Sequence, residues 1–233
     1  MQKYFASFLL IVIFASTCSS PVAAQYSSNW FGVRAGINIA NESVDILPGG
    51  ASTGFRIGPS FGAQYDYSLS DSWALSVGLL FNQKGTHQQY DSASLSQTPP
   101  TTPIAYGGKD DFTLSYIEIP IVAKATFGYG DFKPYLFAGP SIGILMSASE
   151  AVDGTVPPIT DVKTFASSTD ISLYLGGGLQ EQMGSKMVYF DAGYAAGLTK
   201  VFKSNPRTAS NFIDLSTAKS GDIRLAIGML WQI

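Results

Sequence analysis

Apolar and polar residues alternate with a period of two from Gly54 to Leu69. This period predicts a β-strand with one apolar face and one polar face. The strand is far longer than the roughly five or six residues usual in soluble proteins. Its length indicates a strand that crosses a membrane, with lipid against one face and a polar lumen behind the other. The apolar face consists of Phe55, Ile57, Pro59, Phe61, Ala63, Tyr65, Tyr67 and Leu69.

Seven further segments alternate in the same way, and their apolar faces begin at Phe31, Trp73, Ile117, Phe132, Ile171, Val188 and Ile223. Eight such segments predict an all-β fold, an eight-stranded antiparallel up-and-down transmembrane β-barrel. The connections between them alternate between long and short: 41–52, 70–71, 86–111, 128–131, 149–167, 183–185 and 201–219. Outer-membrane barrels have short periplasmic turns and long outer loops. With an even number of strands, we expect both termini to lie in the periplasm.

A soluble β-sandwich or lipocalin-like barrel would also have alternating strands. Its polar faces would be solvated and rich in lysine and glutamate, whereas here they are rich in glycine, serine and alanine. Charged residues make up 13% of the chain, against about a quarter in soluble domains. Both observations favour a membrane barrel.

The N-terminal segment 1–24 has the pattern of a secretory signal peptide. It combines Lys3, an apolar run over residues 8–15 and the small residues Val22-Ala23-Ala24. We therefore expect cleavage before Gln25, so that the outer-membrane β-barrel domain spans residues 25–233.

The single cysteine, Cys18, lies inside this segment, and Thr17 stands where lipidation would need a small residue. The mature chain then has no thiol, which excludes disulfides and cysteine-based metal sites. Removal of Lys3 leaves 13 basic residues against 17 acidic ones, a net charge of −4. This sign argues against nucleic acid as a partner.

Aromatic residues gather where the expected strands meet the periplasmic side. Trp30 and Trp73 begin strands, and Trp231 ends the last one. Such rings prefer the level of the lipid headgroups, where the ring is half-buried and its polar atom stays wet. We therefore expect a periplasmic aromatic girdle formed by Trp30, Tyr65, Tyr67, Trp73, Phe127, Phe132 and Trp231.

The inward faces carry charges that form either an ion path or a set of paired groups. The lumen of an eight-stranded barrel is only wide enough to be filled by side chains, and an unpaired charge there is very costly. We expect Arg34, Arg56 and Arg224 to reach across to Glu118, Asp66 and Asp191. The expected lumen charge network contains Arg34, Arg56, Asp66, Glu118, Lys124, Asp191 and Arg224, with Lys84, Lys133 and Asp222 on the same faces.

A hydrolase at the outer rim is a third possibility. The single histidine, His87, lies in the second long connection, Asp110 and Asp111 lie at its far end, and Ser92, Ser94 and Ser96 could act as nucleophiles. Polar loops of this composition contain such residues in any case, so we expect no catalytic site. The chain has neither a twelve-residue calcium loop nor a glycine-rich phosphate loop. We therefore expect no metal and no cofactor.

The runs Tyr116-Ile117-Glu118-Ile119-Pro120 and Lys133 to Pro140 (KPYLFAGP) resemble the PorT-like family of outer-membrane β-barrel domains, which is common in Bacteroidota and related Gram-negative bacteria. This resemblance implies an eight-stranded barrel, and most family members have no known biochemical role. The C-terminal pattern of Gly228, Trp231 and Ile233 also looks like a barrel-insertion signal. It implies the barrel-assembly machinery and outer-membrane lipids as partners.

The leading functional hypothesis is a small non-enzymatic outer-membrane barrel. Loops on a rigid scaffold commonly carry recognition, so we expect a structural or interaction module that meets an extracellular or periplasmic protein partner. The alternative is a narrow pore or an accessory component of a transport or secretion system.

Overall fold

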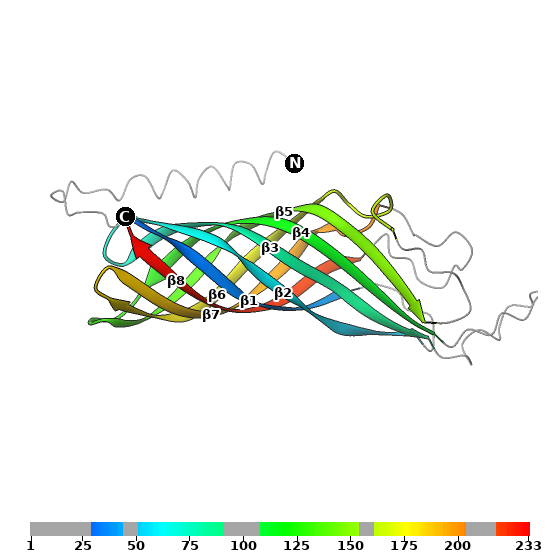
Figure 1. Ribbon diagram of the computed structural model, residues 1–233, viewed down its shortest axis with the longest axis horizontal. Helices are drawn as coiled ribbons and strands as arrows, with labels where there is room; N and C mark the ends of the chain where they lie inside the picture. The colour runs from blue at the N-terminus through cyan, green and yellow to red at the C-terminus, as the bar shows by residue number, and fades with distance from the viewer. Residues whose placement is uncertain (1–28, 44–50, 91–107, 154–160, 204–217) are drawn as a thin grey trace, which may run out of the picture.

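Eight strands form one closed antiparallel barrel in the computed structural model, and β8 pairs back with β1 (Figure 1). This confirms the expected fold class. The structure describes residues 29–43, 51–90, 108–153, 161–203 and 218–233. The strands are β1 (Asn29–Ser43), β2 (Ala51–Ser68), β3 (Trp73–Tyr90), β4 (Gly108–Thr126), β5 (Phe132–Asp153), β6 (Thr169–Met183), β7 (Lys186–Lys200) and β8 (Lys219–Gln232).

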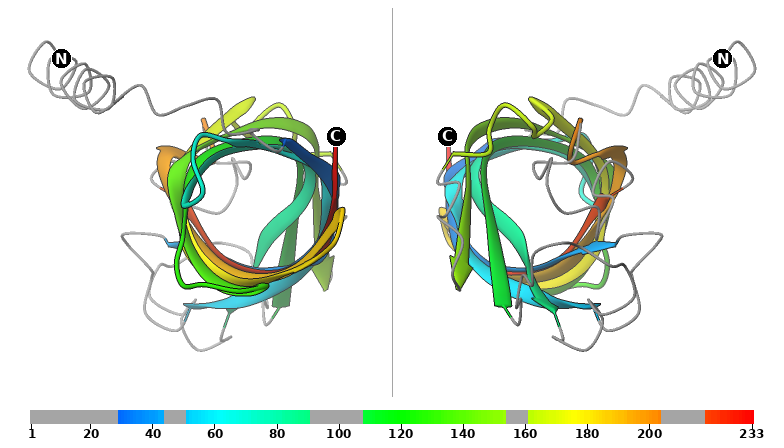
Figure 2. Two further views of the ribbon diagram at one scale, coloured as in Figure 1. Left: turned by 90° about the vertical axis from the view of Figure 1, so that its left-hand side faces the viewer. Right: turned by 90° about the vertical axis from the view of Figure 1, so that its right-hand side faces the viewer.

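The view along the barrel axis shows the strands as a continuous ring (Figure 2). No helix in the described parts of the chain is long and apolar enough to cross a membrane. Residues 1–28 lie outside the described residues, so the signal peptide and the start at Gln25 stay predictions.

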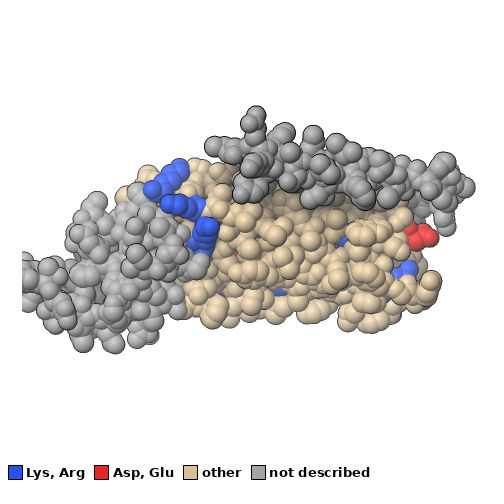
Figure 3. All heavy atoms as spheres, turned by 180° about the vertical axis from the view of Figure 1, so that it is seen from behind, with Lys and Arg blue, Asp and Glu red and all other residues tan. Residues whose placement is uncertain are grey.

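The alternation in the sequence becomes an alternation in burial. In β2, the side chains of Phe55 and Ile57 are 63% and 65% exposed, whereas Ser60 and Asp66 are each 3% exposed. A soluble barrel would bury the apolar set and expose the polar one. The opposite arrangement, an apolar outer wall around a polar interior, is that of a membrane barrel. The space-filling view shows this wall as a band in which charged side chains gather near the ends (Figure 3).

The connections alternate between long and short as expected. The tightest is the two-residue turn Gly184-Ser185 between β6 and β7, because Met183 pairs directly with Lys186. Gly184 has a φ of 62°, and a type II′ hairpin turn places glycine at this first central position.

Three strands continue further outward than the sequence pattern predicts. The expected connections 86–111 and 149–167 are shorter in the structure, because β3 runs to Tyr90, β4 begins at Gly108 and β5 ends at Asp153. These ends extend past the neighbouring strands (Figure 1). The apolar alternation stops at the edge of the lipid because both faces are wet beyond it, while the backbone ladder continues from Thr86↔Phe112 to Tyr90↔Gly108.

Six of the seven expected girdle residues lie on the outer wall. Tyr65 is half-buried, and Tyr67, Trp73, Phe127, Phe132 and Trp231 are exposed.

The assignment of Trp30 to the girdle is wrong. Its side chain is 5% exposed and packs inside the barrel, in one apolar cluster with Met187 and Leu230. Adjacent residues of a strand face opposite sides, and it is Phe31 that faces outward. Trp30 therefore closes the periplasmic end of the lumen.

Candidate functional site in the barrel lumen

Two ion pairs occupy the periplasmic half of the lumen. The Nη2 atom of Arg34 lies 3.2 Å from Oδ1 of Asp191, and Nζ of Lys124 lies 3.2 Å from Oδ2 of Asp66. Ser76 Oγ donates a hydrogen bond of 2.6 Å to Asp66. All five side chains are buried. In this part of the lumen each charged group therefore has one oppositely charged partner, and we call these four charged groups the paired layer.

Aromatic rings fill most of the space around the paired layer. Phe137 and Tyr174 have ring centroids 4.8 Å apart, and Lys124 Nζ lies 4.3 Å from the centroid of Tyr135. The rings lie over glycines of neighbouring strands: a Cβ atom on Gly228 would collide with the ring of Tyr189, and one on Gly178 with Tyr135. The glycines of the inner face thus make room for aromatic side chains.

A cavity of about 20 Å³ remains beside the paired layer. Arg34, Lys124 and Asp191 line it together with Tyr135 and Tyr174. A volume of this size holds about one water molecule. It is a hydration site for the ion pairs and is too small for an organic ligand.

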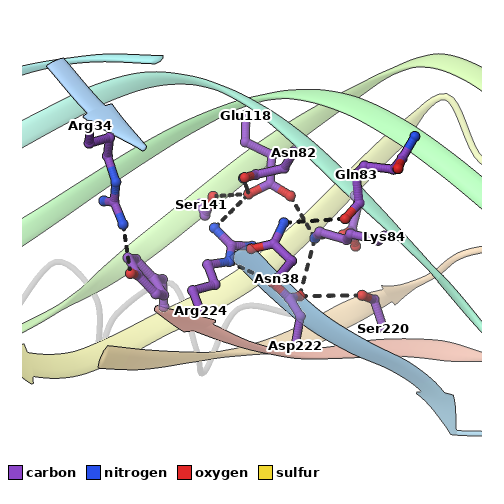
Figure 4. A network of polar contacts seen from close by, with 12 residues as sticks. Arg34, Asn38, Asn82, Gln83, Lys84, Glu118, Ser141, Ser220, Asp222 and Arg224 are labelled. Atoms are coloured by element: carbon purple, nitrogen blue, oxygen red, sulfur yellow. Dashed lines mark hydrogen bonds and ion pairs between the residues drawn. The ribbon is translucent and has the colours of Figure 1, made fainter. Parts of the chain in front are cut away.

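Further outward, five charged residues from five strands form one connected network (Figure 4). Lys84 Nζ lies 2.6 Å from Glu118, 3.0 Å from Asp170 and 3.4 Å from Asp222. Arg224 Nη1 lies 2.7 Å from Glu118, and its Nε contacts Asp222. Two positive charges thus face three negative ones, a balance of −1. We call these five residues the shared network.

Neutral side chains complete the hydrogen bonding of its carboxylates. Glu118 accepts from Asn82 Nδ2 at 2.8 Å and from Ser141 Oγ at 3.3 Å. Asp170 accepts from Thr199 Oγ1 at 3.2 Å. A buried charge is tolerated only when it is paired and hydrogen-bonded, and this network meets both conditions.

An apolar layer covers the shared network on the outer side. Phe112 and Leu114 of β4 pack with side chains of two connections, and the rings of Phe112 and Phe202 meet edge to face at 5.8 Å. The backbone of Ala166 bridges to Phe202 across these connections. We call this layer the outer plug; it contains Phe112, Leu114, Tyr116, Leu145, Ala148, Val162, Ala166, Val201, Phe202 and Ala218.

The residues that the connections contribute to the outer plug were not anticipated. The available signal was the spacing of Val162, Phe165 and Ala166. Three apolar residues at such intervals in a polar connection indicate a face that packs inward.

The structure places the expected lumen charges as follows. Arg34, Asp66, Glu118, Lys124, Asp191 and Arg224 are all buried inside the barrel. Arg34 meets Asp191 and Arg224 meets Glu118, but the partner of Asp66 is Lys124 instead of an arginine.

Arg56 does not join the network. It is half-buried, and no ion pair links it to another side chain among the described residues. It stands opposite Ala40, the last residue of β1 that pairs with β2, so it lies outward of the ionic layers. Lys133 is also half-buried, one residue from the periplasmic start of β5.

The expected hydrolase residues are brought together in part. His87 lies in β3 directly opposite Asp111 of β4, and its Nδ1 contacts Oδ1 of Asp111. The two side chains are 49% and 39% exposed. Ser92, Ser94 and Ser96 lie outside the described residues. Within the part of the chain that the structure describes, no group of His, Cys, Asp and Glu side chains could hold a metal ion.

Comparisons with known proteins agree with this architecture. A family model described as outer membrane protein beta-barrel domain matches residues 23–203. Among solved structures, the chain is similar to Neisserial surface protein A, with 20% identity, a TM-score of 0.43, and coverage of 87% of this chain and 97% of that one. It is also similar to OprG from Pseudomonas aeruginosa, with 14% identity, a TM-score of 0.45, and coverage of 89% and 97%.

No curated protein sequence matches the chain. The family model nevertheless covers well over half of the 233 residues, and the closed eight-stranded barrel is the fold that its description names. The chain therefore belongs to the family of outer membrane protein β-barrel domains and is a protein of the bacterial outer membrane.

Proposed function

We propose that this protein is a sealed, non-enzymatic barrel that acts as a structural or interaction module through its outer end. The observation that carries the proposal is the sequence of buried layers across the lumen. From the periplasm outward these are the apolar end around Trp30, the paired layer with its aromatic rings, the shared network and the outer plug. A hydrated ion would have to pass all of them.

The layers oppose conduction for two different reasons. In the apolar layers a permeating ion would lose its hydration without gaining a partner. In the ionic layers the fixed charges already hold one another at 2.6–3.4 Å. Separating them to admit an ion would leave buried charges without partners.

The outer end is the part of the molecule best suited to interaction. The extended ends of β3, β4 and β5 provide a rigid base for the long connections, and loops held on such a scaffold commonly carry recognition. The exposed pair of His87 and Asp111 belongs to this surface. We assign it no catalytic role, because two exposed side chains lack the enclosed, preorganised surroundings of an active site.

The remaining parts of the proposal follow from the same arrangement. We propose that the protein is a PorT-like member of its family and that both termini lie in the periplasm. Its partners are then outer-membrane lipids, the barrel-assembly machinery during insertion, and an extracellular or periplasmic protein.

Planar-bilayer recording tests the proposal. We expect purified monomeric protein to produce no stable single-channel steps. A matched variant with Phe137→Ala and Tyr174→Ala, which removes two lumen rings and leaves the ion pairs in place, should conduct if the side chains are the barrier. Reproducible steps from the unaltered protein would overturn the sealed-barrel proposal in favour of a pore.

A further inference from the structure

Two lysines face each other at the outer ends of β7 and β8. Lys200 and Lys219 are directly opposite in the β7–β8 register, and both are exposed. Side chains in this relation have Cβ atoms about 4.5–5.5 Å apart, and like charges so placed destabilise a sheet. An anion that binds both ammonium groups would remove this repulsion.

Two more lysines continue the positive charge around the same end of the barrel. Lys163 Nζ donates to the backbone oxygen of Met146 on β5, at 2.8 Å, and Lys203 Nζ donates to Ser168 Oγ just before β6, at 3.1 Å. Both acceptors are neutral, so these bonds position the ammonium groups without cancelling their charge. We call Lys163, Lys200, Lys203 and Lys219 the lysine rim. In Figure 3, basic side chains gather where the apolar wall meets the outer end.

The charge balance differs between the two ends of the barrel. Along the lysine rim, among side chains that the structure describes, four exposed lysines stand beside one exposed carboxylate, Asp161, a balance of +3. At the periplasmic end, Asp71, Asp131 and Glu181 stand beside Lys133 and Lys186, a balance of −1. The excess of positive charge is therefore a property of this outer rim.

The height of the lysine rim places it at the level of lipid headgroups. Lys219 and Trp231 of the girdle are twelve positions apart on β8. At about 3.3 Å per residue and a strand tilt of about 40°, they are separated by about 30 Å along the barrel axis. The apolar band of an outer-membrane barrel is about 25 Å tall. Below Lys219, the outward residues Ile223 and Ile227 belong to this band, at 44% and 62% exposed.

We infer that the lysine rim binds the phosphate groups of the glycolipid headgroups that form the outer leaflet of the outer membrane. Ammonium groups bind phosphate as point charges, and basic residues at a membrane surface are attracted to anionic headgroups. The lipid is the favoured source of phosphate because the lysines project from the barrel wall, directly above its lipid-facing band. This inference goes beyond the proposed function, since it names a ligand class and the residues that hold it.

Lipid retention in nanodiscs tests the inference with the full-length protein. The probes are bisphosphorylated lipid A and lipid A stripped of both phosphates, each diluted in phosphatidylcholine. We expect the protein to retain the phosphorylated form, and the Lys200→Thr/Lys219→Thr variant to bind it roughly tenfold or more weakly. The matched control Lys186→Thr removes an exposed lysine at the periplasmic end and should bind as the unaltered protein does. Equal retention of both lipids, or equal loss in the control, would overturn the inference.

The thermal stability of Lys200→Thr provides a second test through the sign of the change. In phosphatidylcholine alone, the substitution relieves the repulsion with Lys219 and should raise the unfolding temperature. In membranes that contain phosphorylated lipid A, it removes a ligand contact and should lower that temperature. A change of the same sign in both membranes would contradict the inference.

A soluble competitor distinguishes lipid from free phosphate. The probe is the bisphosphorylated lipid A disaccharide without acyl chains. If the lysine rim reads headgroups within the membrane, millimolar disaccharide should leave lipid retention almost unchanged. Displacement at micromolar concentration would show a site for soluble phosphorylated sugars and would overturn the lipid assignment.

Discussion

The paired layer and the shared network solve the same problem in different ways. Both hold buried charges inside a narrow barrel. In the paired layer, Arg34 and Lys124 each have one carboxylate partner, and the charges balance. In the shared network, Lys84 contacts three carboxylates and Glu118 contacts both cations, with a balance of −1.

This difference predicts how far the effect of a single substitution spreads. Removing one member of a pair affects one partner, and the cavity beside Asp191 lets a water molecule replace the lost contact. Removing a member of the shared network affects groups that also hold one another. Substitutions should therefore be nearly independent between the two layers and strongly coupled within the shared network.

The largest effect is expected for Arg224→Met. The side chain is 1% exposed and holds Glu118 and Asp222. Its loss leaves Lys84 as the one cation for three buried carboxylates, so the balance falls from −1 to −2. Breaking a buried pair in this way costs about 3–5 kcal/mol. Urea unfolding in lipid vesicles, followed by the faster gel migration of the unheated folded barrel, measures the loss.

The control for this prediction is Arg224→Lys, which keeps the charge and loses one of the two contacts. It should recover more than half of the lost stability. A decrease below about 1 kcal/mol for Arg224→Met, the size expected of an exposed ion pair, would show that the network does not hold the barrel together.

A smaller effect is expected for Arg34→Met in the paired layer. It leaves Asp191 buried, but the adjoining cavity admits water, so we expect a loss of about 1–3 kcal/mol. The double variant Arg34→Met/Asp191→Leu should recover most of this loss, because an apolar pair can replace an isolated ion pair.

The equivalent double variant in the shared network, Arg224→Met/Glu118→Leu, should not recover. It leaves Lys84 with Asp170 and Asp222 and removes the acceptor of Asn82. Unfolding free energies of the single and double variants form two thermodynamic cycles. Equal recovery in both cycles would remove the distinction between the layers.

The outer wall could be predicted from the sequence because lipid acts on every outward residue in turn. That constraint imposes a period of two over the whole strand, as in β2 from Phe55 to Tyr67. Where the lipid ends, the constraint ends too, and the paired segment of β3 from Thr86 to Tyr90 looked like a loop. Trp30 was misplaced because its height along the strand was considered without its parity.

The lumen partners could be predicted as a set but not pair by pair. Which inward charges meet depends on how strands on opposite sides of the barrel are staggered, and a linear sequence does not contain this directly. Lys84 and Asp170 lie on β3 and β6 and are 86 residues apart. Asp170 was accordingly considered only as one of several loop acids, although it belongs to the shared network.

The smallest effect is expected for Asp170→Asn. The carboxylate contacts Lys84 at 3.0 Å and accepts from Thr199 at 3.2 Å. Its neutral amide keeps an oxygen for both contacts, and the network balance rises from −1 to zero, because two cations then face two carboxylates. Loss of one attraction and relief of the negative excess oppose each other, so the stability should change by less than about 1 kcal/mol. The matched variant Glu118→Gln reaches the same balance but weakens contacts to both Lys84 and Arg224, and it should cost several times more. If the two variants had equal effects in urea unfolding, net charge alone would govern the outer half of the lumen, and the arrangement of contacts around Glu118 would be irrelevant.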